Sequence, residues 1–193
     1  KEADLQANET VVIHGGASGV GTAAIQLAVH TKCQVIATAG SEEKISFCKE
    51  LGADCSVNYH KSDFAQIVKN HYGGADVILD INGAAYLARN IDSLKFKGRL
   101  VFIAILSGDK ANLNIGKVLS KRLHLVGSTL RNRSEEEKTR IVENFKERFW
   151  SELLEGKIKP VIDTIYPIEK INEAHERLRT NSTIGKVVIE IRK

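Results

Sequence analysis

The sequence predicts an α/β protein built on a doubly wound parallel sheet. Short apolar runs recur along the chain, and amphipathic segments separate them. Runs that are continuously apolar are typical of parallel strands buried on both faces, and their alternation with helices is typical of a doubly wound sheet. The six strands are predicted at residues 11–15, 34–39, 56–59, 76–81, 99–105 and 124–130.

Capping signals place helices between these strands. Ser41 is predicted to cap a helix that stops at Gly52. A similar helix is predicted to open at Ser62 and to close on Gly73 and Gly74. The apolar face of the first of these helices consists of Ile45, Cys48 and Leu51.

A longer helix is predicted after Ser134, where three glutamates suit the positive end of the helix dipole. Its apolar stripe consists of Ile141, Phe145 and Phe149. We interpret these side chains as core or subunit contacts rather than as a ligand cage.

The pattern changes at about residue 158. The segments KIKPVIDTIYP and GKVVIEI are predicted as strands of an antiparallel element, with a helix over IEKINEAHERLRT between them. A segment of this length is too short to build a core alone. We therefore predict a main domain at 1–157 and a remnant of another domain at 158–193.

Composition limits the classes of function. The chain has 193 residues, of which 42% are hydrophobic and 27% charged, as in soluble globular proteins. The net charge of +4 is spread along the chain, and no apolar run approaches the length of a membrane span. The N-terminus lacks the features of a signal peptide. We expect a cytoplasmic protein that binds neither nucleic acid nor membrane, and the absence of methionine suggests part of a longer polypeptide.

The three cysteines have no CxxC spacing, so neither a disulfide framework nor a metal site is predicted. Cys33 and Cys48 are interpreted as buried thiols that behave as small hydrophobic groups. His14, at the end of the first strand, is interpreted as a packed histidine rather than a catalytic acid. We assign no catalytic residue in this chain.

The stretch HGGASGVGTAA, residues 14–24, lies between the first strand and the first helix. It matches the dinucleotide-binding pattern GxGxxG imperfectly, because Ser18 replaces the middle glycine. The strand, loop, helix and second strand fit within about 30 residues, as the pattern requires. We predict nucleotide binding rather than a merely structural turn. The aligned residues are Gly16, Ala17, Ser18, Gly19, Val20 and Gly21.

The end of the second strand bears on which nucleotide is bound. NAD-binding loops place an acidic residue there for the ribose hydroxyls, whereas this chain has Ala39 and Gly40. Ser41 and Lys44 begin the next helix, where an anion is favoured. We favour NADPH over NADH. The alternative, in which Ser41 is only an N-cap and Lys44 a solvated lysine beside two glutamates, stays open.

The chain resembles the zinc-independent quinone oxidoreductases of the medium-chain dehydrogenase/reductase superfamily, and most closely the p53-inducible type. The resemblance covers essentially the whole chain in order. The resembling segments are VVIHGGASGVGTAAIQLA, ATAGSEEK, ELGAD, VILDINGAAY, GRLVFIA, LVGSTLR, YPIEKINEAHERL and IGKVVIEI.

The resemblance implies a Rossmann domain and a set of cofactor contacts. The loop from Ala17 to Val20 would contact the pyrophosphate. The 2′-phosphate would lie among Ser41, Lys44 and Tyr59, although a strand-end tyrosine also packs on sheets. The candidates near the nicotinamide ribose are Asn82 and Ile103, with Thr129, Leu130 and Arg131 as weaker ones.

The resemblance also implies NADPH-dependent reduction of a quinone or a related electrophilic carbonyl. The family begins with a GroES-like substrate domain that this sequence does not contain, so we expect the isolated chain to be inactive and residues 158–193 to belong to that domain. The family commonly dimerises by pairing the sixth strands, here HLVGSTL. Two alternatives stay open: a relative of NAD-dependent or zinc-dependent alcohol dehydrogenases, and a non-catalytic nucleotide-binding module.

Overall fold

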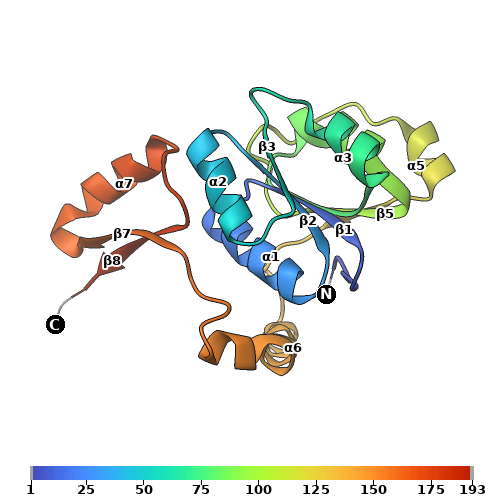
Figure 1. Ribbon diagram of the computed structural model, residues 1–193. Helices are drawn as coiled ribbons and strands as arrows, with labels where there is room; N and C mark the ends of the chain where they lie inside the picture. Colours follow the sequence, from blue (N-terminus) through green and yellow to red (C-terminus); the bar gives the residue numbers. More distant parts are fainter. Residues whose placement is uncertain (1, 192–193) are drawn as a thin grey trace.

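The computed structural model describes residues 2–191. A six-stranded parallel sheet in the order β3-β2-β1-β4-β5-β6 forms its main body (Figure 1). The strands are β1 Thr10–His14, β2 Gln34–Ala39, β3 Cys55–Asn58, β4 Ala75–Asp80, β5 Leu94–Phe102 and β6 His124–Gly127. The predicted α/β fold with a doubly wound parallel sheet is confirmed.

Helices cover both faces of this sheet. They are α1 Gly19–His30, α2 Glu42–Glu50, α3 Phe64–Tyr72, α4 Leu87–Ser93, α5 Ile115–Lys121 and α6 Glu135–Leu154, with a short 3-10 helix at Ala84–Tyr86. Side chains alternate between two cores as strand geometry requires. Val12 packs with Phe64 of α3 on one face, whereas its neighbours Val11 and Ile13 pack with Ile25 of α1 on the other.

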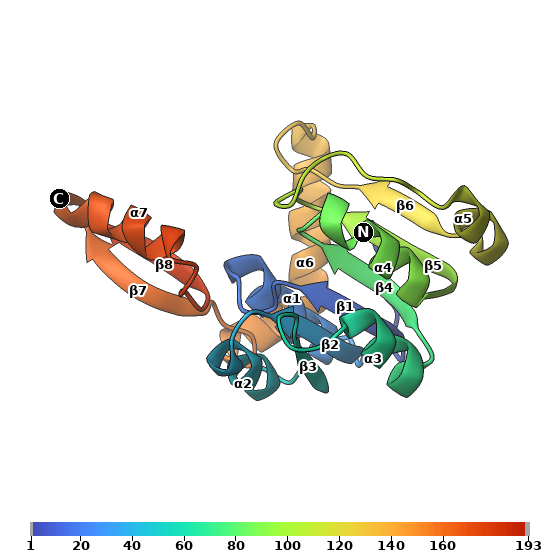
Figure 2. The same cartoon turned by 90° about the horizontal axis from the view of Figure 1, so that it is seen from above.

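The C-terminal segment forms a small unit to one side of the main sheet (Figure 2). It contains β7 Ile162–Pro167, a 3-10 turn at Ile168–Lys170, α7 Ile171–Arg179 and β8 Lys186–Glu190. The prediction of an antiparallel element here is wrong, because β7 and β8 pair in parallel, with Ile165 opposite Val188. The intervening α7 provides the crossover connection that a parallel pair needs.

Several predicted boundaries are corrected by the structure. The fifth strand begins at Leu94 and ends at Phe102, and the sixth ends at Gly127 rather than at residue 130. The helix predicted to open at Ser62 is capped by Asp63, whose carboxylate accepts the amide of Ala65 at 2.9 Å. The caps at Ser41 and Ser134 are confirmed.

The stripe of α6 borders a cavity of about 640 Å³ between this helix, α1 and the sheet. Ile141, Phe145 and Phe149 all line it and are half-buried, so none of them is a fully buried core residue, and the choice between core and subunit contact stays a prediction. Within residues 2–191, no helix combines the length and the apolar character needed to cross a bilayer.

Candidate functional site

The glycine-rich loop joins β1 to α1 through a tight turn. Gly15 has a φ of +64°, and the amide of Ser18 donates to its carbonyl at 2.8 Å. The Ser18 hydroxyl caps α1 by accepting the amide of Gly21 at 3.0 Å. A Cβ atom on Gly21 would lie 2.2 Å from the carbonyl oxygen of Gly15. Glycine at position 21 therefore permits the close packing of helix on loop that the dinucleotide pattern requires.

This loop leaves backbone donors available at the start of α1. Among the described residues, the amides of Gly19 and Val20 have no acceptor, as expected for the first residues of a helix. Val20 is 47% exposed, so solvent and a ligand both reach this position. Free amides at the positive end of a 12-residue helix favour an anion.

The end of β2 forms the next part of the site. Ala39 is buried, and a Cβ atom on Gly40 would lie 2.5 Å from the hydroxyl oxygen of Tyr59. The structure therefore brings Tyr59 from the end of β3 against the end of β2. Ser41 caps α2 by accepting the amide of Lys44 at 3.3 Å, so its N-cap role is confirmed.

Lys44 is partly buried and is not a freely solvated lysine. Its Nζ donates to the backbone carbonyl of Asn181 at 2.5 Å and to the side-chain oxygen of the same residue at 3.3 Å. Burial lowers the pKa of the Lys44 ammonium, and the nearby carboxylates of Glu43 and Asp163 partly oppose that shift. The C-terminal segment thus reaches the edge where Ser41 and Tyr59 lie.

The acidic residue nearest to Ser41 is engaged with other groups. Glu42 accepts a hydrogen bond from Nδ2 of Asn58 at 2.7 Å and pairs with Lys61 at 2.9 Å. These two contacts lower the pKa of the Glu42 carboxyl group, which is fully solvated. The charge of this residue is therefore offset locally by Lys61.

The ends of β4 and β5 are joined by a network around Asp80. Its carboxylate accepts the amides of Asn82 at 2.7 Å and Gly83 at 3.2 Å. The amide of Ile103 donates to the carbonyl of Asp80 at 2.9 Å, and Ser107 donates to the carbonyl of Asn82 through both its amide and its hydroxyl. The structure therefore brings the predicted residues Asn82 and Ile103 together.

A buried polar chain lies beneath this edge of the sheet. His14 is 1% exposed, and its Nδ1 and Nε2 lie 3.0 Å from the hydroxyl of Thr38 and 2.8 Å from Oδ1 of Asn90. Asn90 in turn donates to Asp80 at 3.2 Å. Desolvation lowers the pKa of His14 to about 4, and the hydrogen bond to Oδ1 of Asn90 partly opposes this shift. His14 is thus a packed strand histidine, as predicted.

The residues after β6 follow the strand that pairs with β5, and the amide of Ser128 donates to the carbonyl of Phe102 at 2.9 Å. Leu130 is 60% exposed, and Arg131 and Thr129 are exposed as well. Two strands, β4 and β5, separate β6 from β1 in the sheet. Leu130 and Arg131 therefore lie away from the glycine-rich loop, and their place near the nicotinamide ribose stays a prediction.

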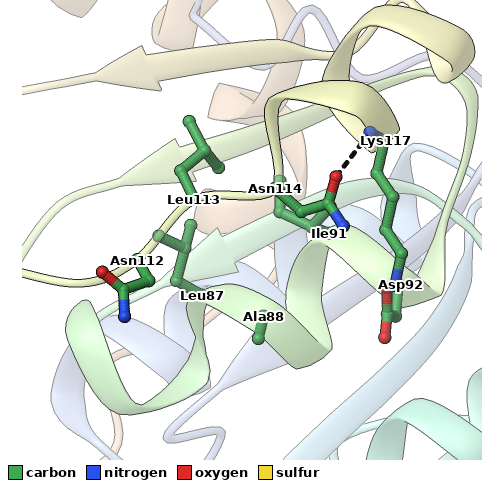
Figure 3. A pocket seen from close by; sticks show the side chains of 8 residues that line it. All are labelled: Leu87, Ala88, Ile91, Asp92, Asn112, Leu113, Asn114 and Lys117. Carbon is green, nitrogen blue, oxygen red and sulfur yellow. Dashed lines mark hydrogen bonds and ion pairs between the residues drawn. The ribbon is translucent and has the colours of Figure 1, made fainter.

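A second cavity, of about 360 Å³, opens between α4 and α5 (Figure 3). Leu87, Leu113 and Lys117 are among its lining side chains, and Lys117 pairs with Asp92. None of the predicted cofactor-binding residues lines this cavity or the one beneath α6. The predicted site is instead a surface formed by the strand ends.

Cysteine and histidine side chains form no metal site in the part of the chain that is described. No group of three or more His, Cys, Asp or Glu side chains is placed there to hold a metal ion. Cys48 is fully buried, and burial raises the pKa of its thiol to about 11. Cys33 is only partly buried, so the prediction of a buried thiol at this position is wrong.

Sequence reasoning missed the residues that the C-terminal segment adds to this edge. Gly185 donates its amide to the carbonyl of Ala17 at 2.8 Å, and Lys186 covers Gly19. Asn181 and the buried Asp80 were also missed. The sequence predicts GKVVIEI as a strand, but it has no signal that brings residue 185 to residue 17.

Comparisons with known proteins agree with this architecture. A family model described as zinc-binding dehydrogenase matches residues 19–147. Human quinone oxidoreductase is 28% identical over 188 residues, which are 96% of this chain and 55% of the relative. Quinone oxidoreductase of Lama guanicoe is 30% identical over 187 residues, 95% of this chain and 55% of the relative.

Two solved structures are similar throughout. An NAD-dependent alcohol dehydrogenase superposes with a TM-score of 0.82 at 33% identity, over 98% of this chain and 53% of that one. A mycobacterial protein complexed with NADPH superposes with a TM-score of 0.82 at 27% identity, over 96% of this chain and 57% of that one. The chain spans about half the length of the curated relatives it matches. The chain belongs to the zinc-binding dehydrogenase family.

Proposed function

We propose that this chain binds NADPH along the carboxyl ends of β1 to β5 and forms the cofactor-binding part of a reductase of quinones or related electrophilic carbonyls. Ligands of open α/β sheets bind outside the carboxyl ends of the strands. Curated quinone oxidoreductases and a mycobacterial protein complexed with NADPH are among the relatives, which supports this assignment.

The residues at the end of β2 are the observation that favours NADPH over NADH. Ala39 and Gly40 offer no carboxylate to repel a 2′-phosphate, and the group of Ser41, Lys44 and Tyr59 offers donors instead. The lysine adds a positive charge, and Gly40 leaves room for the Tyr59 hydroxyl. An NAD-dependent alcohol dehydrogenase is also among the similar structures, so the choice between the two nucleotides needs a direct test.

Each part of the site has a role in this proposal. Reduced nicotinamide supplies a hydride to the substrate when the cofactor is bound. The loop amides of Gly19 and Val20 would hold the pyrophosphate, and Asn82 and Ile103 would position the nicotinamide ribose. The chain's own contribution is therefore to bind and orient, and we assign no proton transfer to its residues.

The family description names zinc, but the described residues do not offer a ligand set for it. The cysteines Cys33, Cys48 and Cys55 are all free, and Cys48 is enclosed in the core. A zinc site needs three or four thiolate, imidazole or carboxylate ligands around one point. We derive no step through zinc from the residues of this chain.

Calorimetric titration of the chain with NADPH and NADH tests the nucleotide assignment. NADPH is expected to bind more tightly, and Lys44→Ala is expected to weaken NADPH by about tenfold, the effect of losing one charged contact. NADH binding should be nearly unchanged in that variant. Lys49→Ala is the matched control, because Lys49 is exposed on the same helix. Equal affinity of the wild-type chain for both nucleotides would overturn the choice of NADPH.

A turnover assay separates the reductase from a non-catalytic module. The longest form of the protein made in its own cells should oxidise NADPH when a quinone is added, whereas this chain alone should not. If the longest form fails to oxidise NADPH with every quinone and enone tested, the non-catalytic module is favoured. Activity with alcohols and NAD would favour the alcohol dehydrogenase alternative.

The sixth strand is also our candidate for self-association. β6 lies at an edge of the main sheet, and its Leu125 is 36% exposed. An unpaired edge strand favours pairing with another strand. We expect light scattering to report a dimer that Leu125→Lys weakens, and a monomeric wild-type chain would count against this pairing.

A further inference from the structure

Lys186, the first residue of β8, lies directly over the glycine-rich loop. A Cβ atom placed on Gly19 would lie 2.3 Å from both Cδ and Cε of Lys186. The aliphatic part of this side chain therefore passes over the first residue of α1. Its ammonium group forms no hydrogen bond or ion pair with the residues described between 2 and 191.

Backbone hydrogen bonds fix this placement. Gly185 forms an isolated parallel bridge with Ser18, and its amide donates to the carbonyl of Ala17 at 2.8 Å. The amide of Lys186 donates to the carbonyl of Val161 at 2.9 Å. A Cβ atom on Gly185 would lie 2.4 Å from that same carbonyl oxygen, and its φ is +88°. Glycine at position 185 thus lets β8 start against the loop.

The neighbouring residues hold the approach to β8 as well. The carboxylate of Asp163 accepts the amide of Ile184 at 2.8 Å and pairs with Arg177 at 3.0 Å. Its side chain is only 6% exposed, and these donors lower the pKa of the Asp163 carboxyl group although desolvation opposes them. The position of Lys186 is therefore set by its surroundings rather than by a contact of its own ammonium.

The loop beneath Lys186 offers donors for one anion. The Gly19 and Val20 amides are free, whereas the Ser18 hydroxyl already accepts the amide of Gly21. An unpaired ammonium beside free amides complements a group that carries two adjacent negative charges. The adenine nucleotide part of NADPH and NADH contains such a group in its pyrophosphate.

We propose that Lys186 binds the pyrophosphate of a dinucleotide held on the Gly16–Val20 loop, donating from Nζ. This inference rests on the proposed function. The pyrophosphate is common to NADPH and NADH, so Lys186 contributes to the affinity for both. It differs in this from Lys44, whose contribution depends on the 2′-phosphate.

Calorimetric titration of the chain with both nucleotides tests this role. Lys186→Ala is expected to weaken NADPH and NADH alike, by about tenfold, whereas Lys186→Arg should stay within about threefold of the wild type because it keeps the charge. Lys170→Ala is the matched control, since Lys170 is an exposed lysine of the same C-terminal segment. Circular dichroism and thermal unfolding verify that each variant is folded.

Two further readouts separate an ionic contact from a structural one. The gap in affinity between wild type and Lys186→Ala should narrow from 50 mM to 500 mM NaCl, because salt screens a solvent-exposed charge. In addition, ADP carries a pyrophosphate without a 2′-phosphate, whereas 2′-AMP carries a 2′-phosphate without a pyrophosphate. Lys186→Ala should weaken ADP alone, whereas Lys44→Ala should weaken 2′-AMP alone.

The outcomes are distinguishable. Unchanged binding of both nucleotides by Lys186→Ala overturns the role of Lys186 and leaves the proposed function intact. A loss confined to NADPH, or an equal loss in Lys170→Ala, also overturns it. If the wild-type chain binds neither nucleotide, the proposed function is overturned, and the pyrophosphate contact of Lys186 falls with it.

Discussion

The imidazole Nε2 of His14 lies 2.8 Å from Oδ1 of Asn90, and both side chains are enclosed in the protein. Since Nδ2 of Asn90 donates to Asp80, the oxygen of that amide is the acceptor. The hydrogen of the neutral imidazole is therefore on Nε2, and Nδ1 accepts the hydroxyl of Thr38. One chain of hydrogen bonds thus runs from β2 through β1 and α4 to the end of β4.

Removal of the Asn90 amide should destabilise the fold. Asn90→Ala leaves the Nε2 hydrogen of His14 without an acceptor and removes one donor from Asp80. We expect a decrease of about 2–4 kcal/mol in the free energy of unfolding, because buried polar groups are left unpaired beside a cavity. Urea unfolding measures it, and the exposed Asn112→Ala serves as control, with a change below about 0.5 kcal/mol.

Acid should destabilise the protein through His14. The folded-state pKa is lowered from 6.5 to about 4, so between those values the unfolded state binds a proton that the folded state does not. The stability that the neutral imidazole of His14 provides is therefore fully present at pH 7, and it is lost as the pH falls toward 4. His14→Gln does not titrate, so its stability difference from wild type should shrink by about 2 kcal/mol between pH 7 and pH 5. Unfolding curves at both pH values measure it, and a constant difference would contradict the buried neutral imidazole.

Two glycines in helices should respond to alanine in opposite directions. In Gly21→Ala the new methyl group would meet the backbone of the loop at 2.2 Å, which cannot move like a flexible side chain, so we expect a loss of about 1–3 kcal/mol. In Gly116→Ala the nearest atom is the side-chain oxygen of Asn114 at 3.3 Å, and helix propensity should stabilise the protein by up to about 1 kcal/mol. Thermal unfolding compares the two, and the same sign for both would contradict this account.

Gly40→Ala should disturb nucleotide binding more than folding. Its methyl group would displace the Tyr59 hydroxyl, which is the far end of a side chain rather than backbone, from the end of β2. We expect NADPH to bind about tenfold more weakly and the free energy of unfolding to change by less than about 1 kcal/mol. Gly127→Ala is the control, because a Cβ atom there meets nothing within 4 Å. Full NADPH affinity in Gly40→Ala would remove Tyr59 from the site.

Local sequence signals predicted the main sheet well because most of its strands are apolar on both faces and several of its helices carry a side-chain cap. Ser18, Ser41 and Ser134 all cap helices through their side chains. The same reasoning gave the wrong direction for the pair β7 and β8. Strand direction depends on how α7 packs against the pair, and alternation of apolar residues along a strand does not encode it.

The candidate site was predictable where it follows a strand end, as at Gly40, Asn82 and Ile103. It was not predictable where contacts join distant parts of the chain. The pairing of Lys44 with Asn181 spans 137 positions, and only the fold brings them together. The burial of Asp80 was not predictable either, because the sequence of the apolar run at 76–81 does not show whether a carboxylate near its end is buried.

The contact between Gly185 and Ala17 makes the C-terminal segment and the glycine-rich loop thermodynamically linked. Any nucleotide that binds more tightly when the segment is docked must also strengthen its docking by the same factor. Hydrogen exchange at the amides of Gly185 and Lys186 should therefore slow when NADPH is added. A protein that draws this segment away would, by the same reciprocity, act as a release factor for the nucleotide.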